Sequence, residues 1–300
     1  MKNKIYGYPI LPKAGLGNML LVWADCYISC KDLKIKQIAP FWRKLRIGTY
    51  LRGERDKREY QRLFTNGKNI SGINRLLLLL ISNKVSTEDF KKTKFKNKLS
   101  LLPKVVTFSS MNNFNRLTGR HNEVLKEVYN ITKPKYWPIN LPKSFIAIHI
   151  RRGDFPEMSN EINQIYFKIP IEWYIDALNQ IRNQIGNDFP VVIFSDGTDE
   201  EVKPILSLPK VIRSSYPESI SDMLAISKAI VIITSKSTYS LFGAFLGQVP
   251  SLWYIGKNDI YKSSYMPAEQ NSSLEIEWMP NQILPDDFMN TIKKRIQNPK

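Results

Sequence analysis

The second half of the chain alternates short apolar runs with segments of helical periodicity. Residues 144–150 and 190–196 are rich in β-branched and aromatic side chains, which is the pattern of buried strands. Apolar positions recur at intervals of three and four over residues 171–185, after Pro170 and before Gly186, and predict one helix. The same patterns predict helices and strands near 199–206, 210–213, 219–228, 229–234 and 237–247. Strands separated by helices of this length predict an α/β fold with a parallel sheet and crossover helices.

The first half of the chain has a less regular pattern. A strand at 4–10 leads through a glycine-containing turn into a helix from residue 19 to about residue 30. Beyond it the sequence predicts a basic helical stretch at 43–64, an apolar helix near 73–82, a lysine-rich loop and a strand at 105–108. Prolines concentrated between residues 133 and 142 suit a linker, so we expect two domains, 1–142 and 143–300.

Length and composition favour ordinary globular domains. The chain has 300 residues, of which 43% are hydrophobic and 11% aromatic, which is enough apolar surface for cores. The most apolar run, 76–81, is far shorter than the roughly 20 residues of a transmembrane helix, and the first residues lack the apolar core of a signal peptide. Cys26 and Cys30 have no cluster of potential metal ligands beside them and are expected to be buried free thiols of a cytoplasmic protein.

Positive charge is concentrated in the first half. Residues 1–143 hold 29 Lys and Arg against 9 Asp and Glu, while residues 144–300 hold 15 against 18. The two halves therefore carry net charges of +20 and −3, which together give the +17 of the chain. The basic half is expected to be attracted to phospholipid headgroups, a pyrophosphate-linked acceptor or nucleic acid; a solvated basic face is the alternative. The sequence has no zinc-finger spacing, RNP-like motif or basic zipper, so we expect no nucleic-acid partner.

Two adjacent arginines, Arg151 and Arg152, follow the predicted strand at 144–150 within the segment His149–Asp154. Ligands bind at the carboxyl ends of the strands in an open parallel sheet, and guanidinium groups match phosphate oxygens. The pair can therefore stabilise a leaving pyrophosphate. Alternatively, either arginine pairs with a nearby carboxylate, Asp154 or Asp196, and both interpretations stay open at this point.

Two acidic residues mark further candidate positions. Asp196 and Gly197 follow the strand at 190–196, where they also suit an ordinary turn. Asp222 lies at the start of a predicted helix. It is either a carboxylate favoured by the helix dipole or an acceptor for the N–H groups of guanine.

Hydroxyl and glycine residues precede two predicted helices. Ser235, Ser237 and Thr238 lie between a strand and a helix, where hydroxyls and backbone N–H groups bind an anion or simply cap the helix. The segment Gly15–Asn18 precedes the first predicted helix. It lacks a third glycine and a Walker lysine, so a dinucleotide-binding or P-loop enzyme is not expected, but it suits a helix N-terminus that meets donor phosphates.

Taken in order, these motifs resemble those of the α1,2-fucosyltransferases, glycosyltransferase family 11. The segments are GLGN, HIRRGD, FSDG, SDMLAISKA and KSTYSLFGAFLG, within residues 14–250. The family typically shows GGLGNQMFQYA, HVRRGDY, FSDD and NSSFSWWGAWL. The chain departs from this pattern at Met19–Leu21, Gly197 and Leu241–Phe242, and the first two departures bear on acceptor identity and linkage.

The resemblance implies a GT-B-like fold of two Rossmann-like domains facing across a cleft, GDP-fucose as donor, and inverting transfer without metal or other cofactor. Arg151 corresponds to the arginine that holds the β-phosphate, His149 and Asp222 to guanine contacts, and Ser237 and Thr238 to phosphate-binding hydroxyls. The implied donor-binding set is Gly15, Gly17, Asn18, His149, Arg151, Arg152, Asp196, Asp222, Ser235, Ser237 and Thr238.

We expect a single in-line displacement at the sugar C1, with Arg151 stabilising the departing GDP. Asp154 and Glu157 are the candidate bases for the acceptor hydroxyl, although Asp154 suits a role in orienting the arginines as well. The expected acceptor is the galactose 2-OH of a glycan or lipid-linked oligosaccharide. Another GDP-deoxyhexose donor is the nearer alternative, and a non-catalytic nucleic-acid-binding protein the more distant one.

The basic stretch Arg43–Arg62 suggests where the protein would act. It suits attachment to an anionic membrane, where lipid-linked acceptors lie. The sequence shows no membrane anchor of the Golgi-enzyme kind. We therefore expect a bacterial, cytoplasmic protein that associates peripherally with the inner face of the membrane.

Overall fold

The described residues form two compact units, one ending at Pro134 and the other beginning at Lys135. The predicted domain boundary after residue 142 stays a prediction. Residues just before it contact the second unit, since Tyr136 O accepts a hydrogen bond from Ser221 Oγ at 2.7 Å. The computed structural model describes residues 4–42, 59–93, 102–111, 114–153, 155–157, 167–235, 237–254, 274–280 and 282–299.

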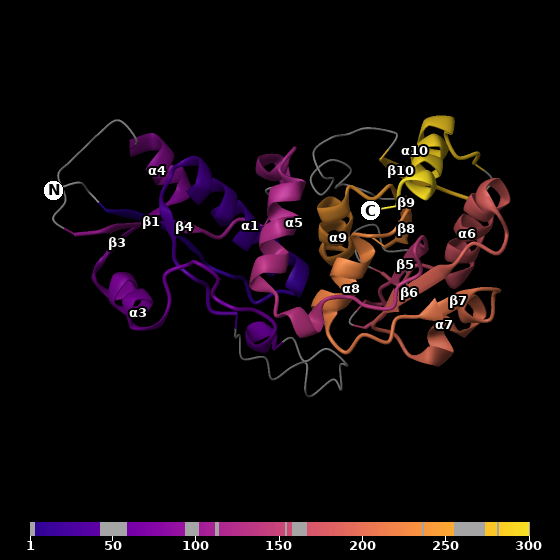
Figure 1. Cartoon of the computed structure of the whole chain (residues 1–300), viewed down its shortest axis with the longest axis horizontal. Coiled ribbons are helices and arrows are strands. Elements are labelled where there is room, and N and C mark those ends of the chain that lie inside the picture. Colours follow the sequence, from indigo (N-terminus) through magenta and orange to yellow (C-terminus); the bar gives the residue numbers. More distant parts are fainter. Residues whose placement is uncertain are drawn as a thin grey trace. The chain divides into compact units, whose positions relative to one another are not determined.

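The first unit is built on a parallel sheet with the strand order β2-β1-β4-β3 among its described residues (Figure 1). Each strand is short, and β1 pairs with both β2 and β4. The strands are β1 (Ile5–Pro9), β2 (Lys36–Gln37), β3 (Asn83–Ser86) and β4 (Lys104–Phe108). The helices are α1 (Leu16–Asp32), α3 (Gly72–Ile81), α4 (Thr87–Thr93) and α5 (His121–Ile131), with single 3₁₀ turns at Tyr60–Arg62 and Phe114–Leu117. A further 3₁₀ turn, Pro134–Tyr136, spans the boundary and leads into the second unit.

Helix α1 packs closely on this sheet. Cys26 and Cys30 lie against Val106 and Phe108 of β4. A β-carbon at Gly7 of β1 would lie 2.2 Å from Cys30 Sγ, so glycine is required for this approach. Both cysteines are buried free thiols, as predicted, with their Sγ atoms 3.9 Å apart.

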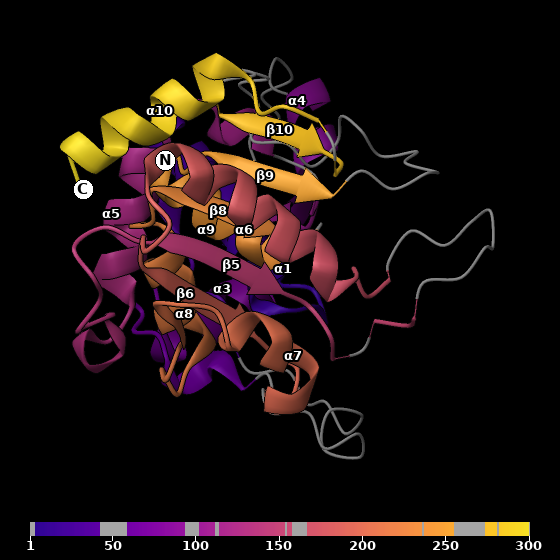
Figure 2. The same cartoon turned by 90° about the vertical axis from the view of Figure 1, so that its right-hand side faces the viewer.

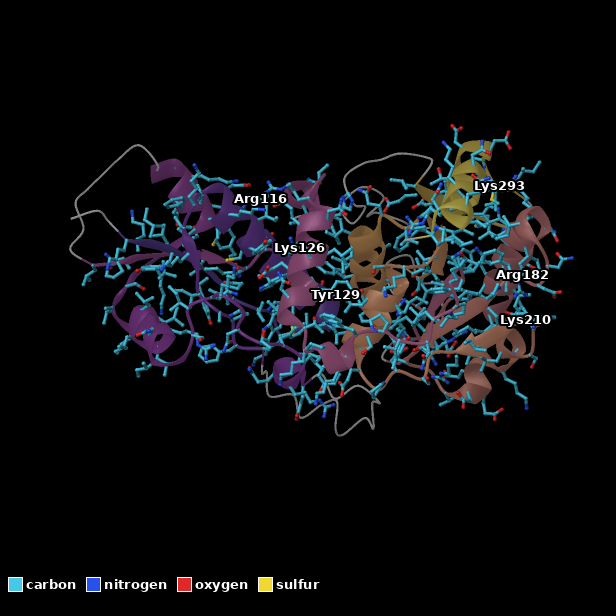
Figure 3. All side chains as sticks on the ribbon, in the orientation of Figure 1. Arg116, Lys126, Tyr129, Arg182, Lys210 and Lys293 are labelled. Carbon is cyan, nitrogen blue, oxygen red and sulfur yellow. The ribbon has the colours of Figure 1, made fainter. Side chains whose placement is uncertain are left out.

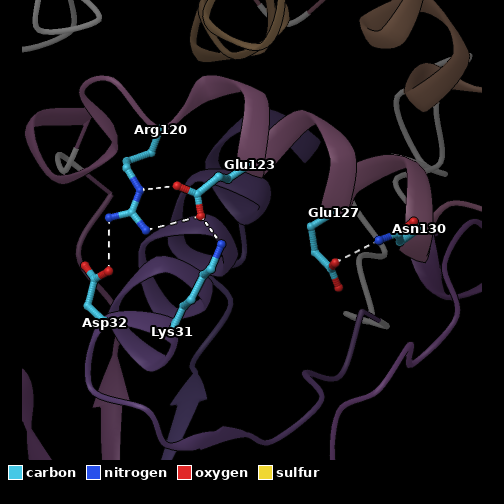
Figure 4. A network of polar contacts seen from close by, with 6 residues as sticks. All are labelled: Lys31, Asp32, Arg120, Glu123, Glu127 and Asn130. Atoms are coloured by element: carbon cyan, nitrogen blue, oxygen red, sulfur yellow. Dashed lines mark hydrogen bonds and ion pairs between the residues drawn. The ribbon is translucent and has the colours of Figure 1, made fainter.

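A network of charged side chains joins α1 to the start of α5 (Figure 4). Lys31 pairs with Glu123, and Arg120 Nε donates to Glu123 Oε1 at 2.6 Å. Arg120 Nη1 also donates to Asp32 Oδ1 at 3.0 Å. The hydrogen bonds from Arg120 and Lys31 lower the pKa of Glu123 to about 2. The network therefore fastens α5 to α1 in its charged form.

The second unit holds a larger parallel sheet with the order β10-β9-β8-β5-β6-β7 among its described residues (Figure 2). Its strands are β5 (Ile146–Ile150), β6 (Val191–Ser195), β7 (Val211–Arg213), β8 (Val231–Thr234), β9 (Ser251–Tyr254) and β10 (Glu275–Trp278). Its helices are α6 (Ile171–Ile185), α7 (Asp199–Leu206), α8 (Ser219–Ile226), α9 (Thr238–Gly247) and α10 (Asp286–Gln297). The predicted parallel sheet is confirmed.

Helices cover both faces of this sheet. Ile146, Ile148 and Ile150 of β5 join a core with α6, α7 and α10, while Ala147 joins a second core with α8 and α9. The alternation follows from the period of two along a strand. Every residue of β5 is therefore buried, which explains why its residues are apolar except for His149.

Arg182 secures the end of α6 (Figure 3). Its Nη2 donates to Phe189 O at 2.6 Å and to Pro209 O at 2.7 Å. The helix ends at Gly186, which has a φ of 122°, as the sequence predicts. Burial lowers the pKa of Arg182. This buried cation thus links the loops that precede β6 and β7.

Most predicted elements of the second half are confirmed, but the first half differs from expectation. The prediction of a lysine-rich loop after residue 82 is wrong in part, because β3 and α4 occupy residues 83–93. Strand β3 lies at the sheet edge and is largely polar, so it carries no apolar pattern. The predicted helix at 43–64 lies mostly outside the described residues, and its described end is the 3₁₀ turn Tyr60–Arg62. In the described ranges, no helix combines the length and apolar character needed to span a membrane.

Candidate functional site

The strand order of the second unit reverses between β5 and β8. From β5 the chain continues to β6 and β7 on one side, and then returns to β8 on the other side and continues to β9 and β10. Register pairs Ile150 with Ser195 and His149 with Thr234, so β5, β6 and β8 end at the same edge. Open parallel sheets bind ligands at this edge, where the order reverses. Three of the sequence motifs therefore meet at the expected position of a ligand.

Asp196, after β6, holds the arginine motif that follows β5. Its Oδ1 accepts a hydrogen bond from Arg152 N at 2.8 Å, and its Oδ2 forms an ion pair with Arg151. The side chains of Arg151 and Asp196 are 25% and 24% exposed, so solvent reaches the pair. The carboxylate pairing considered from the sequence is thus present for Arg151. Its phosphate role stays a prediction.

Two glycines let these loops approach each other. A β-carbon at Gly153 would lie 2.4 Å from Asp196 Oδ2, and one at Gly197 would lie 2.7 Å from Arg152 Cγ. Arg213 Nη2 donates to Ser195 O at 3.1 Å and to Gly197 O at 2.5 Å. The loop that carries Asp196 is therefore held from both sides, which fixes the position of the arginine motif.

Three buried polar atoms on the α6 face lack a hydrogen-bond partner among the described residues: Arg152 Nε, Tyr174 Oη and Ser235 Oγ. Burial raises the pKa of Tyr174, and the neighbouring Ser235 hydroxyl and Arg152 oppose this rise. The Ser235 hydroxyl is thus close enough to the Tyr174 hydroxyl to act on it. Each of the three groups can donate a hydrogen bond. A buried donor without a partner costs about 1–3 kcal/mol, so this set favours an acceptor such as an anion.

Sequence reasoning did not select Tyr174 as a site residue. It was predicted as one apolar position in the helix at 171–185, and it is fully buried on α6. No motif distinguishes it from its core neighbours. Its hydroxyl group on an otherwise apolar helix face was the one available signal, because buried tyrosine hydroxyls usually have a partner.

His149 lies on the opposite face of the sheet, toward α9. Its Nδ1 is 3.5 Å from Thr234 Oγ1, and its ring centroid is 5.3 Å from that of Tyr239. Burial, assisted by the positive charge of Arg151, lowers the pKa of His149 to about 3. The neutral ring keeps one N–H donor and one acceptor. The predicted guanine contact is compatible with this state and stays a prediction.

Helices α9 and α8 begin with polar residues at the same side of the sheet. Ser237 is the N-cap of α9, and its Oγ accepts from Tyr239 N at 3.4 Å, while Thr238 is the first helical residue. Asp222 lies in the first turn of α8 and accepts a hydrogen bond from Ser214 Oγ. The first turn of α9 has no acidic residue, so its N–H groups keep their affinity for anions. Ligand roles for these residues stay predictions.

The structure describes one of the two predicted catalytic carboxylates. Asp154 lies outside the described residues. Glu157 has an 80% exposed side chain and pairs with Lys168 at 2.9 Å. Within the described ranges, no group of three or more His, Cys, Asp and Glu side chains is arranged to hold a metal ion. The base and the expectation that no metal or cofactor is needed both stay predictions.

The predicted glycine motif of the first unit lies where α1 begins, after β1. Gly15 is the N-cap of α1, and a β-carbon there would meet no atom within 4 Å. Gly17 is buried in the first turn, and Asn18 is partly buried. The first turn has no acidic residue, so the N-terminal N–H groups suit an anion. The donor contact predicted for this loop stays a prediction.

Comparisons with known proteins place the chain in a family and identify similar folds. Residues 83–282 match the family model of glycosyl transferase family 11. A mutant of Arabidopsis thaliana FUT1 in complex with GDP matches with a TM-score of 0.51 and 11% identity, over 86% of this chain and 72% of that chain. Fucosyltransferase NodZ from Bradyrhizobium matches with a TM-score of 0.48 and 12% identity, over 83% of this chain and 94% of that chain. A search of curated protein sequences finds no match.

The likeness to FUT1 shows the fold, and the GT-B-like α/β class expected from the sequence is confirmed. The family match covers about two thirds of the chain and includes the segments after β5, β6 and β8. The resemblance deduced from the motifs is also confirmed. This chain belongs to glycosyl transferase family 11.

Proposed function

We propose that this protein transfers fucose from GDP-fucose to a hydroxyl group of a glycan acceptor. The observation that carries the proposal is the meeting of the Arg151, Asp196 and Ser235 segments at the edge where the strand order reverses. Family membership supports glycosyl transfer, and FUT1, which shares the fold, was solved in complex with GDP.

We place the donor pyrophosphate against the donors that the second unit offers. Arg151 would exchange Asp196 for phosphate oxygens, because guanidinium groups bind both in the same bidentate manner. Arg152 Nε, Tyr174 Oη and Ser235 Oγ, which have no hydrogen-bond partner among the described residues, would donate to the phosphate oxygens. The N-terminus of α9 adds favourable N–H groups.

The chemistry is a single displacement at the fucose C1. The acceptor oxygen bonds to C1 as the bond to the β-phosphate oxygen breaks, so GDP leaves with the bonding electrons and the configuration inverts. Arg151 stabilises the charge that develops on GDP, which is the role of a divalent cation in metal-dependent transferases. The acceptor proton passes to a carboxylate, for which Asp154 and Glu157 stay the candidates.

The α1,2 linkage and the galactose 2-OH acceptor are proposed from the motif resemblance. The segments HIRRGD and KSTYSLFGAFLG support them, whereas Gly197 and Met19–Leu21 depart from the family pattern. An acceptor attached to a lipid diphosphate would suit the net charge of +20 on residues 1–143.

Calorimetric titration with GDP and UDP in the presence of EDTA tests the donor site. Binding of GDP without metal, and no binding of UDP, would support the guanine and pyrophosphate assignments. Incubation with a β-galactoside and either GDP-fucose or GDP-mannose, followed by mass spectrometry, then tests the sugar. Product from GDP-mannose alone would overturn the fucose assignment, and failure of both nucleotides to bind would overturn the site.

A further inference from the structure

An apolar helix side lies exposed on the first unit. Helix α3, with the sequence GINRLLLLLI, has no buried residue. Its exposed aliphatic residues follow the spacing i, i+3, i+4, i+7 and i+8, which places them on one side of the helix. The exposed fractions are 67% for Ile73, 53% for Leu76, 48% for Leu77, 82% for Leu80 and 48% for Ile81.

The other side of α3 attaches it to the unit. Arg75 Nη1 donates to Pro40 O at 3.1 Å, and Arg75 Cζ lies 3.7 Å from the ring centroid of Phe41. Leu78 and Leu79, on the same side as Arg75, are partly buried. These contacts fix the rotation of the helix, so its exposed apolar side is a defined surface. Helix sides that face water are normally polar.

The chain segments that directly flank α3 are basic. Residues 60–87 contain no Asp or Glu, and Lys68 and Lys84 are exposed in the segments before and after the helix. An apolar helix side bordered by cations is typical of helices that lie in the interface of anionic membranes. The ten residues of α3 span about 15 Å, which suits a helix lying in the interface and is too short for crossing a bilayer.

We propose that α3 docks the first unit on an anionic lipid surface. Its leucine side would enter the boundary between headgroups and acyl chains, and Lys68 and Lys84 would contact the headgroups. Lipid is favoured over a second copy of the chain for two reasons. A stable dimer buries about 800 Å² on each partner, which is more than one side of a helix about 15 Å long offers. Facing copies would also bring the like charges beside each helix together. The family match begins at residue 83, so this surface lies outside it and does not depend on the proposed function.

Vesicle flotation tests the proposal with matched variants. The test variant carries Leu76→Gln and Leu80→Gln, because glutamine keeps helix propensity. The control carries Ile139→Gln and Ile283→Gln, which change side chains that are 67% and 88% exposed in the second unit. Wild type and control should float with vesicles containing phosphatidylglycerol, and the test variant should partition at least tenfold less. Salt at about 1 M, where screening acts within about 3 Å, should weaken binding of wild type.

A label at the helix tests insertion directly. Leu80→Cys can be labelled selectively with an environment-sensitive fluorophore, because Cys26 and Cys30 are buried. Its emission should shift to the blue with anionic vesicles, and a label at Ile283→Cys should not shift. The proposal is overturned if wild type does not float at low salt, or if the test variant floats equally well. It is also overturned if no protein floats and wild type forms a dimer that the two substitutions of the test variant dissociate. Unchanged circular dichroism of each variant confirms folding.

Discussion

Acid should destabilise the second unit through the site residue His149. The ring is buried beside the uncharged side chains of Thr234 and Tyr239, and among the described residues Arg151 is the charged group that acts on it. Its pKa is lowered from 6.5 to about 3, first by burial and then by Arg151. The unfolded chain therefore binds more protons than the folded protein between these values. The stabilisation is complete above pH 6.5 and is lost as pH falls toward 3.

The magnitude follows from proton linkage. Within the window, each pH unit removes about 1.4 kcal/mol of unfolding free energy. Between pH 7.5 and pH 5 the loss attributable to His149 is therefore about 2 kcal/mol. Because pH 5 lies well above the folded pKa, a shift of that pKa by one unit leaves this value unchanged.

Urea unfolding of wild type and His149→Gln at both pH values measures the effect. On acidification, the unfolding free energy of wild type should fall by about 2 kcal/mol more than that of the variant. The chain has two histidines, and His121 is common to both proteins, so its contribution cancels. In NMR spectra, the ring signal of His149 is the one that the variant lacks. In wild type this signal should not titrate between pH 8 and 4.5. Equal losses in both proteins, or a ring titration centred above pH 5.5, would refute the buried neutral histidine.

Further substitutions test the same site and the first unit. Gly153→Ala should displace the Asp196 carboxylate, since its β-carbon would lie 2.4 Å from Oδ2, and should weaken GDP binding about tenfold by calorimetry. Tyr174→Phe removes a buried hydroxyl without a partner, so it should maintain or raise the melting temperature yet lower turnover at least tenfold; unchanged turnover would exclude a ligand role. The pKa of Glu123 is lowered to about 2. The stabilisation that its ionised carboxylate contributes to the fold is therefore present above pH 4.5 and is lost as pH falls toward 2. Glu123→Gln should cost about 1 kcal/mol at pH 7, after allowance for solvent screening, and nothing near pH 2, as measured by urea unfolding.

The sequence predicted the second unit well because its central strands β5, β6 and β8 are buried on both faces. Runs such as 190–194 are apolar throughout, and the helices between them begin and end at Pro, Ser, Thr or Gly. The same patterns could not reveal β3, whose four residues lie at a sheet edge and include Asn83 and Lys84. Edge strands have one unpaired side and need no apolar alternation.

The site was predictable in part for a similar physical reason. Polar residues placed just after buried strands are identifiable from the sequence, so Arg151, Asp196 and Ser235 could be grouped at one edge. Which strands are neighbours depends on long-range pairing, and only the structure shows β5 between β6 and β8. Tyr174 could not be identified, because a helix position facing the core has the same pattern whether or not its hydroxyl serves a ligand.

The turnover of GDP-fucose by Arg151→Ala tests the central claim most directly. Single-turnover release of GDP, with enzyme and a β-galactoside acceptor in excess, isolates the chemical step. The substitution should slow this step at least about a hundredfold, since it removes the charge that stabilises the leaving GDP, while the circular dichroism spectrum stays unchanged. A folded variant that releases GDP within about threefold of the wild-type rate would contradict a donor site built on Arg151.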